Sequence, residues 1–298
     1  MHKVLVSEPH IASYSAFLLL GIVAGYLISR WRAVRIGIEG AHIDNLTLLI
    51  VIVSLFGARI FSWWFEFPEG ISLWSALTTA SGGMVFYGGL IFGVLAVIAY
   101  AACTCLSLGN LADACAPGLA LGLAVGRIGC FMAGCCWGDV CINDAQATAI
   151  HDPGVLRQVR TVAFLSPSTY PLAVRFPSEA GASEQHRELE LVPKEAGQSL
   201  PVHPVQLYET ALALLLCGYL HRAFKRRAWE GEIIWQFVLG YGVIRFCLEF
   251  FRADNPAAFA GLTLSQVISI VMVVAAIAAF RHHRSDIRIA RLKPVRLD

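Results

Sequence analysis

Runs of about 20 apolar residues, separated by short polar segments, dominate the pattern of hydrophobic and polar positions along the chain. Such runs are long enough to cross the hydrocarbon core of a bilayer as helices. The pattern predicts an all-α polytopic membrane protein with seven transmembrane helices. We expect these spans at 11–29, 46–65, 84–104, 111–137, 204–220, 231–251 and 260–280.

Three basic clusters give the predicted orientation of the helices. They follow the first span (30–35), separate the fifth from the sixth (221–232) and follow the seventh (281–296). Lys and Arg favour the cytoplasmic side, and seven spans with the N-terminus outside place all three clusters there. The first apolar run is followed by "RWRAVR" rather than by a small-residue cleavage site, so we expect a retained span and not a signal peptide.

One stretch, 139–202, lacks the apolar character of the spans and carries mixed charge with several Pro and Ser residues. The predicted topology places it outside the membrane, as a small extracytoplasmic cap domain between the fourth and fifth helices. We therefore expect four regions: a membrane bundle with spans 1–4 (1–138), the cap (139–202), a bundle with spans 5–7 (203–280) and a basic cytoplasmic tail (281–298).

Composition agrees with a membrane protein. The 298 residues are 57% hydrophobic and only 15% charged, whereas a soluble domain is about a quarter charged. The net charge of +2 is small, and its uneven placement along the chain is what carries information. We expect no nucleic-acid partner.

Several charged residues fall inside the predicted spans, where each costs about 2.5–3.5 kcal/mol to insert. In the predicted topology three arginines lie in the outer half of the bilayer, and only Glu249 is close enough to pair with one of them. Arg offers a fork of donors that fits phosphate, so the surplus positive charge predicts binding of a phospholipid head group. The charged residues are Arg59, Asp113, Arg127, Arg245 and Glu249.

Other polar side chains gather at the same predicted level. Individually, a Tyr there is typical of an interfacial aromatic and a His of a helix start. Glycine pairs at 82–83 and 88–89 allow close helix approach or an unwound turn. The polar set consists of Tyr14, Tyr87, His203, Gln206, Tyr208, Glu209 and Tyr241.

Taken together, these segments resemble the prolipoprotein diacylglyceryl transferase family. "GARIF" (57–61) is similar to its Gly-x-Arg segment, and "GGMVFYGGL" (82–90) to "GGMSFHGGL". "GRIGCFMAGCCWG" (126–138) resembles the signature Gly-Arg-x-Gly-Asn-Phe-x-Asn-x-Glu-x-x-Gly. "HPVQLYE", "YGVIRFCLEFFR" and "GLTLSQ" follow in the family's order.

The resemblance implies a transferase of the bacterial inner membrane. Such enzymes move the diacylglyceryl group of outer-leaflet phosphatidylglycerol to a prolipoprotein cysteine thiol and release glycerol phosphate. The candidate catalytic residues are Arg127 and Arg245 on the phosphate, Glu249 orienting Arg245, and Tyr87 and Tyr14 lining the site. The candidate substrate-binding residues are Arg59, Gly126, Gly129, Gly138, His203, Gln206, Tyr208, Glu209, Tyr241, Cys130 and Cys135. No cofactor is implied.

The sequence departs from the family where the chemistry takes place. Tyr87 replaces the family's histidine, a proposed general base, and Cys130, Ala133 and Cys135 replace two Asn and one Glu of the signature. A tyrosine with an ordinary pKa of about 10 is a poor base at neutral pH. The glycine frame and Arg127, which form the phosphate-binding part, are kept.

Cys130, Cys135, Cys136 and Cys141 form the pattern C-x4-CC-x4-C. It lacks the C-x2-C pairs of zinc sites, so we expect no metal. The main interpretation is a disulfide among Cys135, Cys136 and Cys141. The alternatives are packing residues, or a reactive thiolate beside Arg127 that itself attacks the lipid glycerol carbon.

Two further functions stay open at this point. One is a non-catalytic phospholipid-binding protein that keeps the phosphate site without the base. The other is a membrane thiol–disulfide protein using Cys135 and Cys136. Release of glycerol phosphate distinguishes the enzyme from the lipid-binding protein, and cysteine-to-serine changes distinguish the redox protein.

Overall fold

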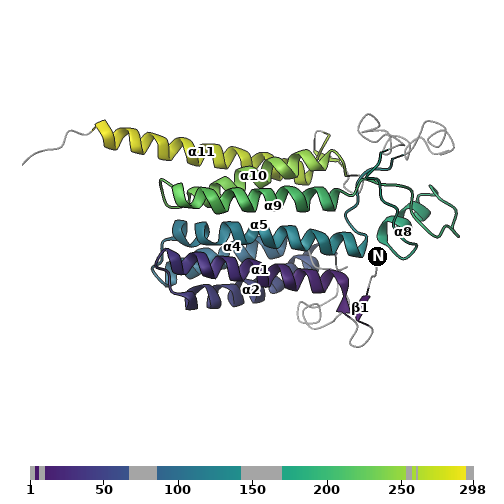
Figure 1. Cartoon of the computed structure of the whole chain (residues 1–298), viewed down its shortest axis with the longest axis horizontal. Coiled ribbons are helices and arrows are strands. Elements are labelled where there is room, and N and C mark those ends of the chain that lie inside the picture. Colours follow the sequence, from purple (N-terminus) through teal and green to yellow (C-terminus); the bar gives the residue numbers. More distant parts are fainter. Residues whose placement is uncertain are drawn as a thin grey trace, which may run out of the picture. The chain divides into compact units, whose positions relative to one another are not determined.

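The computed structural model describes residues 4–6, 11–66, 86–141, 170–252, 257–259 and 261–292. Helices make up most of this part of the chain (Figure 1). Seven of the helices described have 18 residues or more, and each overlaps one predicted span. They are α1 (Ser13–Arg35), α2 (Gly40–Glu66), α4 (Phe86–Cys103), α5 (Leu108–Ala133), α9 (Val205–Ala223), α10 (Glu232–Glu249) and α11 (Leu264–Leu292).

Four of the described helices are long and apolar enough to cross a membrane: Ser13–Arg35, Gly40–Trp64, Leu108–Ala133 and Leu264–His283. A shorter apolar helix covers Tyr87–Cys103. Large apolar side chains on these helices remain exposed, for example Leu19, Leu48 and Val271 at 62–63%. Extended apolar surface of this kind suits lipid rather than water. The chain is therefore a helical membrane protein.

Two helices run more than one turn past their predicted C-terminal ends. Helix α1 includes the basic cluster 30–35, and α11 continues to Leu292, well into the predicted tail. Arg and Lys are good helix formers, so a charge cluster that ends the apolar run does not end the helix. The glycine pair 82–83, the central part of the cap (142–169) and the last tail residues (293–298) lie outside the described residues.

The chain divides into two compact units. The first comprises Met1–Gly25, Pro117–Arg226 and Trp235–Asp298, and the second comprises Tyr26–Ala116 and Arg227–Ile234. In the first unit, α1 and α5 approach closely through glycines: a Cβ added at Gly21 would lie 2.8 Å from the carbonyl oxygen of Gly122. Small residues permit this backbone contact between membrane helices.

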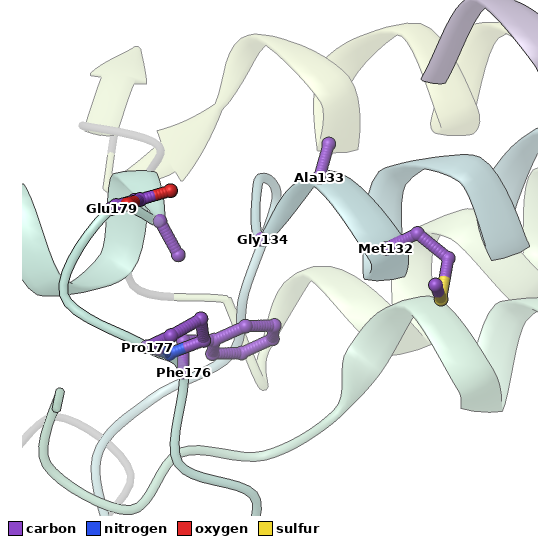
Figure 2. A pocket seen from close by; sticks show the side chains of 7 residues that line it. Met132, Ala133, Gly134, Phe176, Pro177 and Glu179 are labelled. Carbon is purple, nitrogen blue, oxygen red and sulfur yellow. The ribbon is translucent and has the colours of Figure 1, made fainter. Parts of the chain in front are cut away.

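The described part of the cap packs on the end of α5. Its core is formed by Trp137, Phe176 and Val202 with alanines of the short helix α8 (Gly181–Glu188) and its N-terminus. The segment 170–177 forms isolated bridges to 198–202 rather than a strand. A cavity of about 20 Å³ lies here, lined by Phe176, Pro177 and Glu179 of the cap and by the end of α5. Figure 2 shows these side chains, with the ring of Phe176 pointing toward Gly134.

Gly134 permits this packing. Its φ of +67° lies in the left-handed region, and an added Cβ would lie 2.5 Å from the Cβ of Ala180. Only glycine meets both requirements without strain. The chain therefore leaves α5 and turns under the cap at this residue.

Short strands occur only as pairs within the described residues. β1 (Val4–Val6) pairs antiparallel with β2 (Ile11–Ala12), and β3 (Ala257–Phe259) with β4 (Leu262–Thr263) just before α11.

The second unit is built on the crossing of α2 and α4. A Cβ added at Gly88 would lie 2.4 Å from the carbonyl oxygen of Gly57. Glycine at the first position of the 88–89 pair thus serves close helix approach, one of the two roles predicted for the pair. The pair is helical, because α4 begins at Phe86.

Candidate functional site

The C-terminal end of α5 and the N-terminal end of α9 meet in the first unit. Thr210 donates a hydrogen bond from Oγ1 to the carbonyl of Ala124 (3.2 Å), and Gln206 donates from Nε2 to the carbonyl of Cys135 (2.7 Å). Both side chains are buried, which strengthens these bonds. The first two turns of α9 are thereby held at the level of Arg127 on α5.

Arg127 forms a buried ion pair at this junction. Its Nε lies 2.9 Å from Oε2 of Glu209, and the hydroxyl of Tyr241 donates to Oε1 of the same carboxylate (2.9 Å). The Glu209 side chain is 1% exposed and that of Arg127 is 17% exposed. The carboxylate is therefore held from two sides, while the guanidinium side chain stays partly exposed.

This pair corrects the expectation that Glu249 alone could reach one of the arginines. From the sequence we expect Glu209 to be a substrate-binding residue at the entry of a span, without a charge partner. It reaches Arg127 because α9 begins beside the end of α5, at the same level.

A second group of charges lies at the end of α10. Arg245 contacts Glu249 one helical turn later (Nη2 to Oε2, 3.0 Å), as predicted, and also donates to Oγ of Ser265 (3.2 Å). Arg252 places its Nε 3.9 Å from the same carboxylate oxygen, and Thr263 donates from Oγ1 to Oε1 (2.7 Å). One buried carboxylate thus faces two guanidinium groups, and the group carries net positive charge.

Arg245 has an unused donor. Its Nη1 is buried and makes no hydrogen bond within the part of the chain that the structure describes. A buried donor without an acceptor costs about 1–3 kcal/mol. An anionic oxygen at this position would satisfy it.

The loop 135–141 crosses the ends of α9 and α10. The amide of Gly138 donates to the carbonyl of His203 (2.9 Å), and the amide of Asp139 donates to the carbonyl of Phe251 (2.7 Å). A Cβ added at Gly138 would lie 2.5 Å from Cγ2 of Val205. Gly138 is therefore needed for close approach of the loop to α9.

His203 is enclosed rather than open to a substrate. Its ring is 1% exposed and packs against Tyr170 and Phe251. Its Nδ1 lies 3.2 Å from the hydroxyl of Tyr208, which donates to the hydroxyl of Tyr170 (2.9 Å). His203 and Tyr208 thus connect α9 to the cap, and this arrangement favours a positioning role over substrate contact.

Tyr14 lies at the start of α1, against Gly129. A Cβ added at Gly129 would lie 3.3 Å from the backbone oxygen of Tyr14 and 2.9 Å from Cβ of Phe17. Tyr14 itself is 43% exposed. In contrast, a Cβ added at Gly126 would meet nothing within 4 Å, so this position of α5 faces open space.

Arg59 and Tyr87 belong to the second unit. Arg59 follows Gly57 on α2, and Tyr87 precedes Gly88 on α4, so both lie beside the glycine contact of these helices. Both side chains are half-buried.

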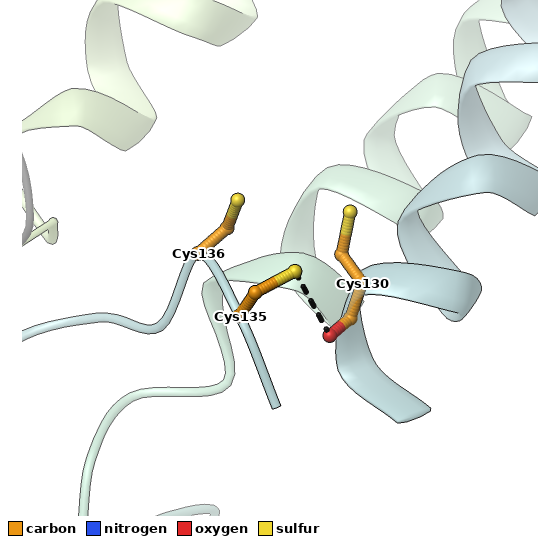
Figure 3. Close-up of side chains that lie close together, drawn as sticks. All are labelled: Cys130, Cys135 and Cys136. Atoms are coloured by element: carbon orange, nitrogen blue, oxygen red, sulfur yellow. Dashed lines mark hydrogen bonds between the residues drawn. The ribbon is translucent and has the colours of Figure 1, made fainter. Parts of the chain in front are cut away.

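The cysteines of the signature gather at one point (Figure 3). The Sγ atoms of Cys130, Cys135 and Cys136 lie within 4.8 Å of one another, and Cys135 Sγ contacts the carbonyl of Cys130 (3.6 Å). All nine cysteines lie within the described residues, and all are free thiols. The predicted disulfide is therefore not formed in this structure.

Cys141 stands apart from this cluster. Burial and the nearby Asp139 raise the pKa of its thiol to about 11, so it is protonated at neutral pH and acts as a packing residue. Burial also raises the pKa of Asp139 to about 7, although its Oδ1 accepts the amide of Val140 (2.8 Å).

Three residues near the site are not among the predicted site residues: Arg252, Asp139 and Cys136. Arg252 and Cys136 lie inside the segments that resemble the family's motifs, and Asp139 directly follows one of them. The signal that could have found Arg252 is its i, i+3 spacing from Glu249. Asp139 and Cys136 acquire their surroundings only when the loop turns back after Gly134.

Several known proteins are similar in sequence to this chain over most of its length. A phosphatidylglycerol–prolipoprotein diacylglyceryl transferase of Clostridium tetani is 25% identical, over 92% of this chain and 94% of its own. The enzyme of the same name from Solidesulfovibrio magneticus is 30% identical over 88% and 86%, and that of Citrobacter koseri is 28% identical over 86% and 84%.

The family model described as prolipoprotein diacylglyceryl transferase matches residues 3–281. This match includes every residue described above for the two ion-paired groups, together with the loop 135–141. The chain therefore belongs to the prolipoprotein diacylglyceryl transferase family.

Proposed function

We propose that this protein transfers the diacylglyceryl group of phosphatidylglycerol to the thiol of a prolipoprotein cysteine. The observation that carries the proposal is the buried, unused Nη1 donor of Arg245. Arg127 supports it with a guanidinium that is held by Glu209 on one side and remains partly exposed. Phosphate is the anion that a phosphatidylglycerol head group offers to such donors.

The two carboxylates prepare the arginines for this task. Glu209 and Glu249 are buried, and each holds a guanidinium by a contact of 2.9–3.0 Å. Donors fixed in advance need no reorganisation when the phosphate arrives or when its charge changes. Arg252, which also lies beside Glu249, adds a third positive charge to those of Arg127 and Arg245.

In the proposed reaction the acceptor thiolate attacks the glycerol carbon that bears the phosphate ester. A carbon–sulfur bond forms, the carbon–oxygen bond breaks, and the electron pair leaves with glycerol phosphate. Arg127 and Arg245 stabilise the charge of the departing phosphate. Tyr14 and Tyr87 are the candidates for handling the acceptor proton, and Arg59, Gly126, Gly129, Gln206 and Cys130 for shaping the lipid site.

We also propose the membrane arrangement of the sequence analysis: seven spans, the N-terminus outside, and the C-terminus in the cytoplasm of a bacterial inner membrane. The cap (139–202) then lies outside, between the membrane regions 1–138 and 203–280, and 281–298 forms the tail. Substrate lipid enters from the outer leaflet. The length of the seven helices and the placement of basic clusters support this arrangement.

The test uses full-length protein in nanodiscs that contain head-group-labelled phosphatidylglycerol, with and without a lipobox peptide. We expect water-soluble glycerol phosphate only when the peptide is present. Arg245→Lys keeps the charge but loses the second donor arm, and we expect it to lower release by about a hundredfold. Arg226→Ala, which removes an exposed arginine outside the site, is the matched control.

Two outcomes would reject the proposal. No release by the wild type, with lipid still bound in an Arg127-dependent way, would indicate a lipid-binding protein without this chemistry. Equal release of glycerol phosphate by the wild type and by Arg245→Lys would show that Arg245 does not act in the reaction.

A further inference from the structure

The cluster of Cys130, Cys135 and Cys136 is a built site and not a chance approach of thiols. Cys130 comes from the last turn of α5, whereas the other two follow the end of that helix (Figure 3). The turn that brings them back uses Gly134 at φ +67° and Cys136 at φ +59°. A left-handed conformation is uncommon outside glycine, and such strain is concentrated at functional sites.

Neighbouring groups fasten the turn. The amide of Cys135 donates to the carbonyl of Cys130 (3.1 Å). The buried Gln206 donates to the carbonyl of Cys135 (2.7 Å), which fixes the peptide between the two adjacent cysteines. The thiols thus converge because hydrogen bonds and a strained residue hold the backbone.

The dimensions fit a thiophilic metal ion. A zinc ion with Zn–S bonds of about 2.3 Å in tetrahedral geometry separates its sulfur ligands by about 3.8 Å. The three Sγ atoms already lie within 4.8 Å of one another, so small side-chain rotations bring them to that separation. Cys130 is buried and the other two are half-buried, which leaves a side open for a fourth ligand.

Charge also fits. Three thiolates around a divalent ion carry a net charge of −1, and around a monovalent ion −2. Arg127 lies one helical turn before Cys130 on α5, so a positive charge stands on the same face of the helix as the cluster. Soft thiolate ligands select Zn²⁺ and Cu⁺ over the hard cations Mg²⁺ and Ca²⁺.

We infer that Cys130, Cys135 and Cys136 form a three-thiolate binding site for one thiophilic ion, Zn²⁺ or Cu⁺. This site adjoins the arginine pair of the proposed transferase but does not depend on that activity. The ion ties the end of α5 to the loop 135–141 and, through Gln206, to α9.

Metal binding is measured on full-length protein in nanodiscs after reduction and removal of metal. Zn²⁺ is titrated in competition with a chromophoric chelator, and Cu⁺ in competition with a cuprous indicator in the absence of oxygen. The ion with the lower dissociation constant is the one that the site prefers. We expect one equivalent per chain. Cys136→Ser should weaken binding by about a hundredfold, whereas Cys103→Ser with Cys105→Ser, which removes two exposed thiols elsewhere, should not change it.

A second measurement needs no variant. In the wild type, bound metal should protect Cys130, Cys135 and Cys136 from alkylation, mapped by mass spectrometry, while Cys103 and Cys105 are alkylated as before. Three results would overturn the inference. They are no metal retained by the reduced wild type, equal metal binding after Cys136→Ser, or alkylation of Cys130, Cys135 and Cys136 that bound metal does not reduce.

Discussion

At the residue scale, the pair of Arg127 and Glu209 is the best-defined ion pair of the candidate site. A buried carboxylate beside a partly exposed guanidinium is costly unless both gain hydrogen bonds. Here Glu209 gains two, from Arg127 and Tyr241. We interpret Glu209 as a positioning residue that aims Arg127 at the lipid phosphate.

Replacement of Glu209 by Gln tests this interpretation. Gln keeps an oxygen for the Tyr241 hydroxyl but loses the charge that holds Arg127. We therefore expect the free energy of unfolding to fall by about 3 kcal/mol. We also expect turnover to fall by about tenfold or more with little change in lipid affinity, because the arginine still meets phosphate but in the wrong position. Glu188→Gln, on the exposed face of the cap, should change neither.

A lipid titration of the release assay separates the two parameters. If Glu209→Gln raises KM and leaves kcat unchanged, Glu209 contributes to uniform lipid binding and not to positioning.

Gly138 gives a second prediction at this scale. Gly138→Ala places a Cβ 2.5 Å from Val205 Cγ2 and 2.7 Å from the carbonyl oxygen of His203. Backbone atoms cannot move away cheaply, so we expect a loss of about 1–3 kcal/mol in unfolding free energy. A Cβ at Gly197 meets nothing within 4 Å, and Gly197→Ala in the same unit should be neutral in thermal unfolding. Equal midpoints for the two variants would contradict the close contact of the loop 135–141 with α9.

Sequence reasoning identifies some of these residues and misses others for physical reasons. Arg127, Arg245 and Glu249 are predictable because charge inside an apolar run needs a partner or a ligand. The pairing of Glu209 is not, because it depends on which helix ends meet. The C-x4-CC spacing lacks C-x2-C and so predicts no metal site, whereas the left-handed turn at Gly134 and Cys136 brings three thiols together despite that spacing.

At the scale of elements, hydropathy predicts the existence of all seven long helices and is least accurate at their ends. Apolar runs mark where a helix meets lipid, but hydrogen bonding continues into charged turns. Helix α5 shows the opposite difference: it ends at Ala133 and not at 137, because Gly134 adopts a left-handed conformation.

Asp113 is a charged residue inside a predicted span for which the sequence indicates no partner. Its partners come from the segment that leads into helix α10 and from the first turn of that helix. In the second unit its carboxylate accepts the amides of Gly231, Ile233 and Ile234 and an Nη1 donor of Arg227. The free amides at the start of α10 are thereby satisfied, with negative charge at the positive end of the helix dipole. The cost of burying Asp113 is offset by these bonds.

The described part of the cap should lose stability in acid. His186 of α8 is buried, its Nδ1 accepts the amide of Leu200 (3.2 Å), and burial lowers its pKa to about 4. The unfolded chain takes up a proton below a pH of about 6.5 and the folded cap does not. The stability present above that pH is therefore lost as the pH falls toward 4, by about 3 kcal/mol.

Hydrogen exchange of the segment 186–200 measures this loss, corrected for the intrinsic pH dependence of exchange. We expect faster local opening at pH 4.5 than at pH 7. His186→Asn keeps an acceptor for Leu200 without a group that titrates in this range, so its opening should not change between the two pH values. Identical pH dependence in both proteins would show that His186 is not responsible.

At the scale of the whole molecule, the proposed topology makes a prediction about sidedness. Cys103 and Cys105, which are exposed around the end of α4, should face the cytoplasm, and the cap should face outward. A membrane-impermeant maleimide added to intact spheroplasts should label Glu188→Cys and leave Cys103 and Cys105 unlabelled until the membrane is opened. Labelling of Cys103 or Cys105 in intact cells would reverse the orientation.

The whole chain combines a family scaffold with an altered set of polar residues. The match extends over residues 3–281, while the resemblance drawn from the sequence implies that Tyr87, Cys130 and Cys135 stand where the family has His, Asn and Glu. The arginines and the carboxylates that hold them pair without any contribution from these positions, and the phosphate site that we propose rests on them. The central claim is therefore that lipid transfer persists with a different route for the acceptor proton.

The most direct measurement of this claim is the mass of the acceptor. Full-length protein in phosphatidylglycerol nanodiscs is incubated with a lipobox peptide, and the peptide is analysed by mass spectrometry. The account predicts a peptide that gains one diacylglyceryl group at its cysteine thiol, with about a hundredfold less product from Arg245→Lys. A peptide of unchanged mass, from protein that still binds the lipid, would contradict the account.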